Sequence, residues 1–180
     1  MRIPGENTVG LFIDIQEKLF PHMQEKDMLE HNLISMSAGL KILEIPFMVT
    51  EQYTKGLGFT ISPLKLALGE YSAIEKSAFS CCDEPVFISR LQATGKKNVI
   101  LCGIETHVCV LQTAIDLIKA GYLPVVIEDC VSSRKLADKQ IAIERMRQEG
   151  AIISSLESVL FELTRFSGTG AFKAISRLVK

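Results

Sequence analysis

Apolar and polar positions follow two alternating patterns along the chain, one typical of strands and the other typical of helices. Short apolar runs rich in β-branched residues indicate strands that are buried on both faces. Longer segments with apolar residues three or four positions apart indicate helices with one buried face. The predicted strands cover residues 8–15, 46–52, 72–79, 98–104, 122–131 and 151–155. The predicted helices cover residues 27–43, 83–95, 107–120 and 136–148, and two more lie on either side of residues 167–170.

The segment between the second and third predicted strands has a different composition. Gly56, Gly58 and Pro63 lie close together there, which is typical of a loop over residues 53–63. The Gly-x-Gly pair lacks the third glycine of a dinucleotide-binding motif and does not open a helix directly after a strand. We therefore expect no nucleotide and no other cofactor.

The regular alternation of strand and helix predicts an α/β fold: a doubly wound, Rossmann-like parallel sheet of six strands with helices on both faces. In the common strand order 3-2-1-4-5-6, the first and fourth strands are neighbours where the order reverses, and ligands bind beyond their carboxyl ends. Asp14 and residues 103–109 fall at that place.

Composition narrows the class of protein further. The chain has 180 residues, of which 47% are hydrophobic, and is therefore expected to form a single domain over residues 1–180 around one core. Its net charge of -1, without a long run of either sign, disfavours nucleic acid as a partner. No apolar segment has the length of a signal peptide or a membrane helix, so we expect no membrane partner and a cytoplasmic location.

The cysteines and histidines lack the spacing of a metal site. Five cysteines without a C-x-x-C pair, in a chain that is not expected to be exported, predict free thiols. The three histidines form no H-E-x-x-H motif and no zinc spacing with the cysteines, so no metal is expected.

Asp14 and Cys109 are the candidate functional residues at the ends of the first and fourth predicted strands. A carboxylate at the end of a buried strand is costly unless it is paired or protonated, although a hydrogen-bonded structural role explains it equally well. The beginning of a helix lowers the pKa of a thiol, which favours a nucleophilic Cys109. A lone cysteine early in a helix is nevertheless more often a small packed apolar residue. The residues alone leave both interpretations open.

Longer stretches of the sequence resemble the isochorismatase-like cysteine hydrolases, in particular the YcaC-like branch of unassigned substrate. The resemblance is carried by LFIDIQEKLF, VTEQYTKGLG, AIEKSAFSC and LCGIETHVCVLQTAIDLIKAGYLPVVIEDCVSSR. Its most specific piece is the G-x-x-T-x-x-C-V element, which begins at Gly103 and contains Cys109. The resemblance implies the same doubly wound fold and a catalytic triad of Asp14, Lys76 and Cys109. Without it, Lys76 would be taken for a solvated surface charge.

The resemblance also implies a cis peptide bond between Ile104 and Glu105. This bond would turn the Glu105 N–H toward the same point as the Cys109 N–H, so that the two form an oxyanion hole. Metal-dependent relatives carry an Asp-x-His element after the second strand, where this chain has Gln52 and Tyr53.

These implications predict a metal-independent cysteine hydrolase. Asp14 would take the Cys109 proton, and the thiolate would cleave an amide-type C–N bond of a small molecule through a thioester. Gln16, Phe20, Gln52 and Tyr53 are expected to line the substrate pocket, and a homo-oligomer is expected from the family. Two alternatives remain: a redox-active thiol protein, or a catalytically silent protein that acts through assembly.

Overall fold

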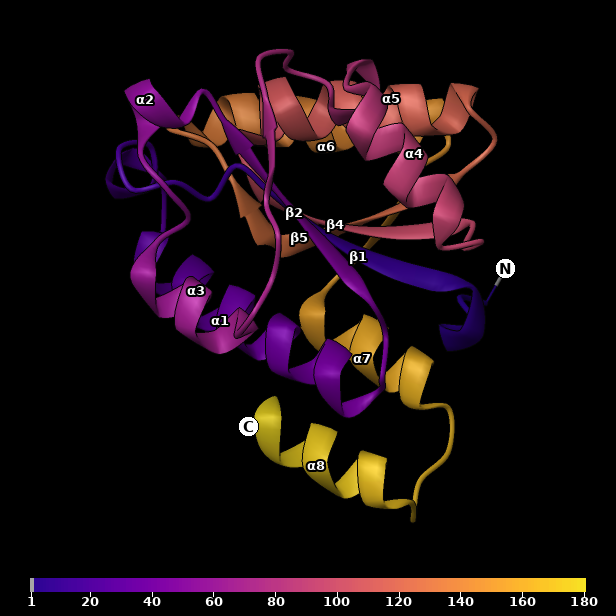
Figure 1. Cartoon of the computed structure of the whole chain (residues 1–180). Coiled ribbons are helices and arrows are strands. Elements are labelled where there is room, and N and C mark those ends of the chain that lie inside the picture. The colour runs from indigo at the N-terminus through magenta and orange to yellow at the C-terminus, as the bar shows by residue number, and fades with distance from the viewer. Residues whose placement is uncertain (1) are drawn as a thin grey trace.

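A parallel sheet of six strands runs through the middle of the protein, with helices on both faces (Figure 1). The structure is a computed structural model and describes residues 2–180. The strands are β1 (Thr8–Ile13), β2 (Phe47–Gln52), β3 (Ile74–Lys76), β4 (Asn98–Ile104), β5 (Leu123–Ser132) and β6 (Ile152–Ser154). Their order is β3-β2-β1-β4-β5-β6, and every neighbouring pair is parallel. The predicted doubly wound fold, with its order reversing between β1 and β4, is confirmed.

The helices form the outer layers of the molecule. They are α1 (Lys26–Ile42), α2 (Thr54–Leu57), α3 (Ser62–Leu68), α4 (Pro85–Ala93), α5 (Leu111–Lys119), α6 (Leu136–Glu149), α7 (Leu156–Thr164) and α8 (Gly170–Leu178). Figure 1 shows α4, α5 and α6 on one face of the sheet and α1, α3 and α7 on the other, with α8 outside α1 and α7.

The sheet separates two apolar clusters, and this explains the continuous apolar runs of its central strands. Successive side chains of a strand point to opposite faces. In β1, Leu11 packs into the cluster under α4, α5 and α6, while Phe12 packs into the cluster on the α1 side. All residues of β1 and β4 are buried, so neither strand shows the polar alternation of a strand with one solvated face.

Two predicted segments have a different secondary structure from the one expected. Residues 53–63 contain α2 and the beginning of α3. Pro63 lies in the first turn of α3, where a backbone N–H has no acceptor within the helix, so the N–H that proline lacks is not needed. The helix predicted from residue 107 begins instead with a π-helical segment, Thr106–Val110, which continues into α5 at Leu111. π-helical turns of this kind are frequent at functional sites.

The two edge strands of the sheet are short. β3 and β6 have three residues each, whereas the strands between them have six to ten. The sequence predicts longer strands at both edges, because local pattern does not reveal where pairing with a neighbour ends.

Candidate active site

Three reactive side chains from distant parts of the chain lie together at the carboxyl edge of the sheet. Asp14 directly follows β1, Lys76 is the last residue of β3, and Cys109 lies in the π-helical segment after β4. Their exposed fractions are 0%, 1% and 7%. Lys76 Nζ is 2.6 Å from Asp14 Oδ2, so the acid and the amine form a buried ion pair.

The Asp14 carboxylate has a different partner at each oxygen. Oδ1 accepts a hydrogen bond of 2.8 Å from the Thr50 hydroxyl. Oδ2 faces Lys76, but the contact departs from hydrogen-bond geometry and Oδ2 has no hydrogen-bond donor within residues 2–180. Burial raises the pKa of Asp14, although the nearby Lys76 ammonium, the hydrogen bond from Thr50 and the adjacent Cys109 thiol act in the opposite direction.

The ammonium of Lys76 is surrounded by acceptors. It donates to Gln52 Oε1 at 2.6 Å and to the carbonyl oxygens of Ala78 and Phe79 at 3.0 and 3.1 Å. Burial lowers the pKa of Lys76, but Asp14 and the neighbouring thiols of Cys109 and Cys81 together outweigh it, and the net pKa is raised. Lys76 is therefore a buried cation whose hydrogen-bond donors are fixed by the surrounding backbone and by Gln52.

The resting form of Cys109 differs from the prediction. Burial and the neighbouring Asp14 carboxylate raise the pKa of the Cys109 thiol, and Lys76 opposes them only in part. The expected low-pKa thiolate at a helix beginning is therefore wrong for the resting protein, because burial and the adjacent carboxylate favour the neutral thiol. Cys109 is a protonated thiol beside a carboxylate that can accept its proton.

Gln16 and Gln52 connect the site to the loop after β2. Gln16 is fully buried; its Nε2 donates to the carbonyls of Gln52 and Gly58 at 2.9 and 2.7 Å, and its Oε1 accepts from the Gln52 N–H at 2.7 Å. The Gln52 side chain lies between Lys76 and the Ser77 carbonyl. Both glutamines thus hold backbone and lysine in place.

The other two residues expected at the pocket lie in contrasting surroundings. Phe20 is buried in the apolar cluster on the α1 side. Tyr53 is 56% exposed, and its ring covers Gly56, where an added Cβ would lie 2.2 Å from Tyr53 Cε1. Of the four, Tyr53 alone presents a large surface to solvent.

The segment that leads from β4 to Cys109 is held by charged partners that the sequence did not reveal. The peptide bond between Ile104 and Glu105 is cis. The Glu105 carboxylate accepts from Arg134 Nε at 2.9 and 3.1 Å. His107 Nδ1 lies 2.9 Å from Ser133 Oγ and 3.8 Å from Glu105 Oε2. Ser133 and Arg134 could have been predicted from their position directly after β5, because the carboxyl ends of β1, β4 and β5 lie at the same edge of the sheet.

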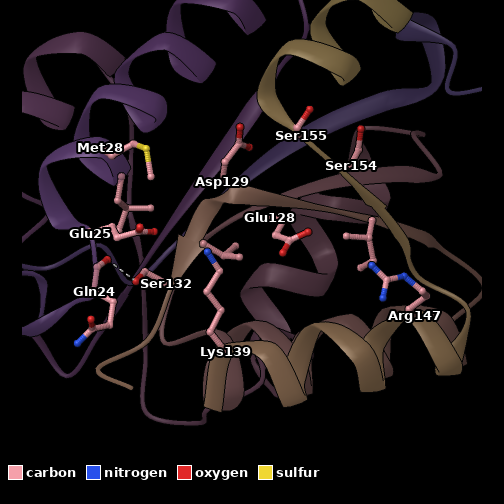
Figure 2. Close-up of a pocket in the computed structure, with 13 residues that line it drawn as sticks. Gln24, Glu25, Met28, Glu128, Asp129, Ser132, Lys139, Arg147, Ser154 and Ser155 are labelled. Atoms are coloured by element: carbon pink, nitrogen blue, oxygen red, sulfur yellow. Dashed lines mark hydrogen bonds between the residues drawn. The ribbon is translucent and has the colours of Figure 1, made fainter. Parts of the chain in front are cut away.

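The cavity shown in Figure 2 lies apart from this cluster. It has a volume of about 480 Å³ and is enclosed by the beginning of α1, the ends of β5 and β6, and α6. In Figure 2, Lys139 and Arg147 extend from α6 toward Glu128, and Ser132 donates to the Gln24 carbonyl at 2.8 Å. Asp14, Lys76 and Cys109 are not among its lining residues. We place the candidate active site at the triad, because the reactive groups converge there and size alone does not define a site.

Three further properties of residues 2–180 bear on function. No group of three or more His, Cys, Asp or Glu side chains in this part of the chain is arranged to hold a metal ion. None of its helices combines the length and the apolar character needed to cross a bilayer. All five cysteines are free thiols, as predicted.

The fold and the cluster define a class of protein: a doubly wound α/β protein with an acid, an amine and a thiol enclosed at the point where the strand order reverses. A family model described as the isochorismatase domain matches residues 8–158. The secreted isochorismatase effector Isc1 of Phytophthora sojae is 37% identical over 185 residues, which cover 99% of this chain and 87% of that protein.

Solved structures agree with this match. The structure of MAR1 ribonuclease from Caenorhabditis elegans has a TM-score of 0.93 and 38% identity, and covers 99% of this chain and 92% of that one. YcaC from Escherichia coli, described as an octameric hydrolase of unknown specificity, has a TM-score of 0.92 and 24% identity and covers 99% and 90%. The chain belongs to the isochorismatase family and has the hydrolase fold of that family. The resemblance seen in the sequence is confirmed.

Proposed function

We propose that the protein is a cysteine hydrolase that cleaves an amide-type C–N bond of a small molecule through a thioester. The observation that carries this proposal is the buried cluster of Asp14, Lys76 and Cys109. A carboxylate with a raised pKa beside a protonated thiol can serve as a base, and a fixed cation keeps it ionised when it is needed.

The proposed reaction has two halves. Asp14 takes the Cys109 proton while the sulfur attacks the carbonyl carbon, and the resulting oxyanion is stabilised by the N–H groups of Glu105 and Cys109. When the C–N bond breaks, the amine leaves with the proton from Asp14, and the acyl group remains on Cys109 as a thioester. Water then attacks the thioester with Asp14 as base, which releases a carboxylic acid and restores the thiol.

The backbone around Cys109 supports the oxyanion hole. Glu105 and Cys109 have exposed fractions of 8% and 7%, so the proposed donors lie in a part of the site that is largely closed to water. Fixed N–H groups in such surroundings stabilise a developing oxyanion more strongly than they would in water. The triad and these N–H groups supply base, nucleophile and oxyanion donors, so the proposed reaction needs no metal ion.

The substrate class and the assembly state are part of the proposal. The net charge of -1 favours a small molecule over RNA, even though the C. elegans relative is described as a ribonuclease. We also propose a homo-oligomer: Leu136 and Ile141 on α6 are 50% and 66% exposed, and apolar side chains of this kind are typical of contact surfaces. A cytoplasmic location stays a prediction, and the P. sojae relative is described as secreted.

The observed thiols do not favour the redox alternative. Peroxides react with thiolates, whereas burial raises the pKa of Cys81, Cys82, Cys109 and Cys130. A resting thiol that ionises only when Asp14 takes its proton suits a substrate-triggered nucleophile better than a peroxide sensor.

Intact-mass detection of a covalent adduct tests the proposed function. The protein would be exposed to a panel of small amides, hydroxamates and aldehydes, and peptide mapping would locate any adduct. We expect modification at Cys109, loss of adduct and turnover in Cys109→Ala, and no loss in the control Cys82→Ala. Turnover that survives in Cys109→Ala would refute the nucleophile, and a panel without adduct or turnover would favour the catalytically silent alternative.

A further inference from the structure

Thr50 and Cys81 are buried beside the triad and have no part in the reaction described above. Thr50 lies in β2 and pairs with Ile13 at the end of β1. Cys81 opens the 3-10 turn Cys81–Asp83, and its N–H donates to Thr113 Oγ1 at 3.0 Å. Both side chains have an exposed fraction of 0%. The local sequence pattern does not connect either of them with Asp14.

These two residues form a directed chain of hydrogen bonds that ends on Asp14. The Cys81 thiol donates to Thr50 Oγ1 at 3.8 Å, and the Thr50 hydroxyl donates to Asp14 Oδ1 at 2.8 Å. A threonine hydroxyl has one hydrogen. Because Thr50 receives a hydrogen from Cys81, its own hydrogen is directed to Asp14 and to no other acceptor. Burial raises the pKa of Cys81 to about 11, so Cys81 stays protonated and keeps its role as donor near neutral pH.

The hydrogen bond from Thr50 makes the two oxygens of Asp14 unequal. Oδ1 accepts from Thr50, whereas Oδ2 faces Lys76 and has no hydrogen-bond donor among the described residues 2–180. A second link, from the Asp14 N–H to the Thr50 carbonyl at 3.1 Å, holds the two backbones together independently of the hydroxyl. The side-chain bond can therefore be removed without removing the strand pairing.

We propose that Thr50 is a positioning residue that occupies Oδ1 of Asp14 and thereby reserves Oδ2 for the proton of Cys109. Cys81 supports this role by fixing the direction of the Thr50 hydroxyl. The inference rests on the proposed function, since it assumes that Asp14 is the base for Cys109. It assigns a role in the reaction to a threonine in a buried part of β2, where a hydroxyl would otherwise only form a structural hydrogen bond.

A role of Thr50 in positioning the base predicts the direction in which the pKa of Asp14 changes when the hydroxyl is removed. The Thr50 hydrogen bond lowers the pKa of Asp14, so its loss raises that pKa. The titratable groups that face Asp14 are Lys76, Cys109 and Cys81, and all three are retained in a Thr50 variant. If Asp14 must be ionised to activate Cys109, the pH at which Cys109 reaches half of its plateau reactivity moves upward when the hydroxyl is removed.

The experiment measures the rate of Cys109 alkylation by iodoacetamide from pH 4 to pH 9, located by peptide mapping. Thr50→Val removes the hydroxyl and keeps the branched shape, Thr50→Ser keeps the hydroxyl, and Asp14→Asn removes the base. We expect the half-plateau pH to rise in Thr50→Val, to stay near the wild-type value in Thr50→Ser, and the pH step to vanish in Asp14→Asn. Thr8→Val is the matched control, because Thr8 is a fully buried threonine at the opposite end of the neighbouring strand. Within residues 2–180 its hydroxyl bonds only to the Pro4 carbonyl and Asn98.

The outcomes separate this inference from the proposed function. An unchanged profile in Asp14→Asn refutes the base, and the role of Thr50 fails with it. A vanished step in Asp14→Asn together with a wild-type profile in Thr50→Val refutes the role of Thr50 alone. A shift as large in Thr50→Ser or Thr8→Val as in Thr50→Val also refutes it, because the effect would then follow from packing. Thermal melting of each variant, followed by circular dichroism, shows whether the alkylated form is folded. If Thr50→Val is unfolded, the pH profile of Cys81→Ala replaces it as the test of the inference, with the same expected upward shift.

Discussion

Asp14 is a charged residue in a position that the apolar pattern of β1 would fill with a hydrophobic side chain. Its neighbours decide what the charge can do: Lys76 pairs with it, Thr50 occupies one oxygen, and Cys109 lies beside it. Removing one partner of a buried ion pair leaves an uncompensated charge, and the cost of that charge exceeds the stability that the pair contributes.

Lys76→Met should therefore destabilise the protein by about 3–5 kcal/mol at pH 7. Without the nearby cation the pKa of Asp14 rises further, because burial then acts on the charged carboxylate with less opposition. The loss of stability should therefore shrink as the pH falls toward 4 and the carboxyl becomes neutral. Urea unfolding at both pH values measures the effect.

The control for this prediction is Lys55→Met, because Lys55 is exposed on α2, and a surface substitution of this kind is expected to stay within about 0.5 kcal/mol. The double variant Asp14→Asn with Lys76→Met should lose less stability than Lys76→Met alone. Equal losses in the single and double variants would contradict the buried pair.

The sequence revealed the site only in part. Asp14 and Cys109 could be found because strand ends and helix beginnings are visible in the apolar pattern. Lys76 came from the family resemblance, since an isolated lysine in a short strand carries no signal of burial. Thr50, Cys81 and Arg134 were missed, because their importance depends on which side chains meet across the sheet edge.

At the scale of the elements, the carboxyl ends of β1 and β4 approach closely because of one glycine. Gly103 in β4 pairs with Ile13 in β1 and has a φ of 145°. A Cβ at this position would lie 2.3 Å from the Ile13 carbonyl oxygen. The close pairing brings Asp14, one residue after Ile13, next to the segment that carries Cys109.

Gly103→Ala should consequently destabilise the protein by about 3 kcal/mol, because both the backbone angle and the contact with β1 are unfavourable for a Cβ. Gly121→Ala is the matched control: Gly121 also has a positive φ, 78°, but nothing lies within 4 Å of its Cβ position. Its cost should be about 1 kcal/mol, from the backbone alone. Thermal and urea unfolding measure both, and equal losses would show that the contact with Ile13 is not limiting.

The elements themselves were largely predictable. The strand predicted over residues 98–104 coincides with β4, since a β-branched apolar run bounded by polar residues has little ambiguity. α3 was missed because Ser62 and Pro63 suggest a turn as readily as a helix beginning. The π-helical segment could not be predicted, since it adds about one residue to a single helical turn and so barely changes the spacing of apolar residues.

At the scale of the whole molecule, buried thiols connect stability to alkaline pH. Burial raises the pKa of Cys81 to about 11 and that of Cys82 to about 12, and it also raises the pKa of Cys109 and Cys130. In the unfolded chain these thiols ionise near pH 8.5. The unfolded state therefore loses protons first as the pH rises, and the free energy of unfolding falls.

We predict that the free energy of unfolding decreases above about pH 9, with each thiol contributing up to about 1.4 kcal/mol per pH unit. Urea unfolding under reducing conditions at pH 8, 9 and 10 measures the slope. Cys130→Ala should show a smaller slope than the wild type, because Cys130 is fully buried and far from the triad along the chain. An identical slope in both proteins would contradict the role of the buried thiols.

The short edge strands β3 and β6 have a consequence for how copies of the protein can meet. A long exposed edge offers a row of free amide and carbonyl groups that recruits a strand from another molecule. Edges of three residues offer only a brief row, so extending the sheet from one molecule into the next gains little. Growth of an assembly is then left to the outer helices, where the shapes of side chains, rather than a repeating backbone ladder, limit how many partners can attach.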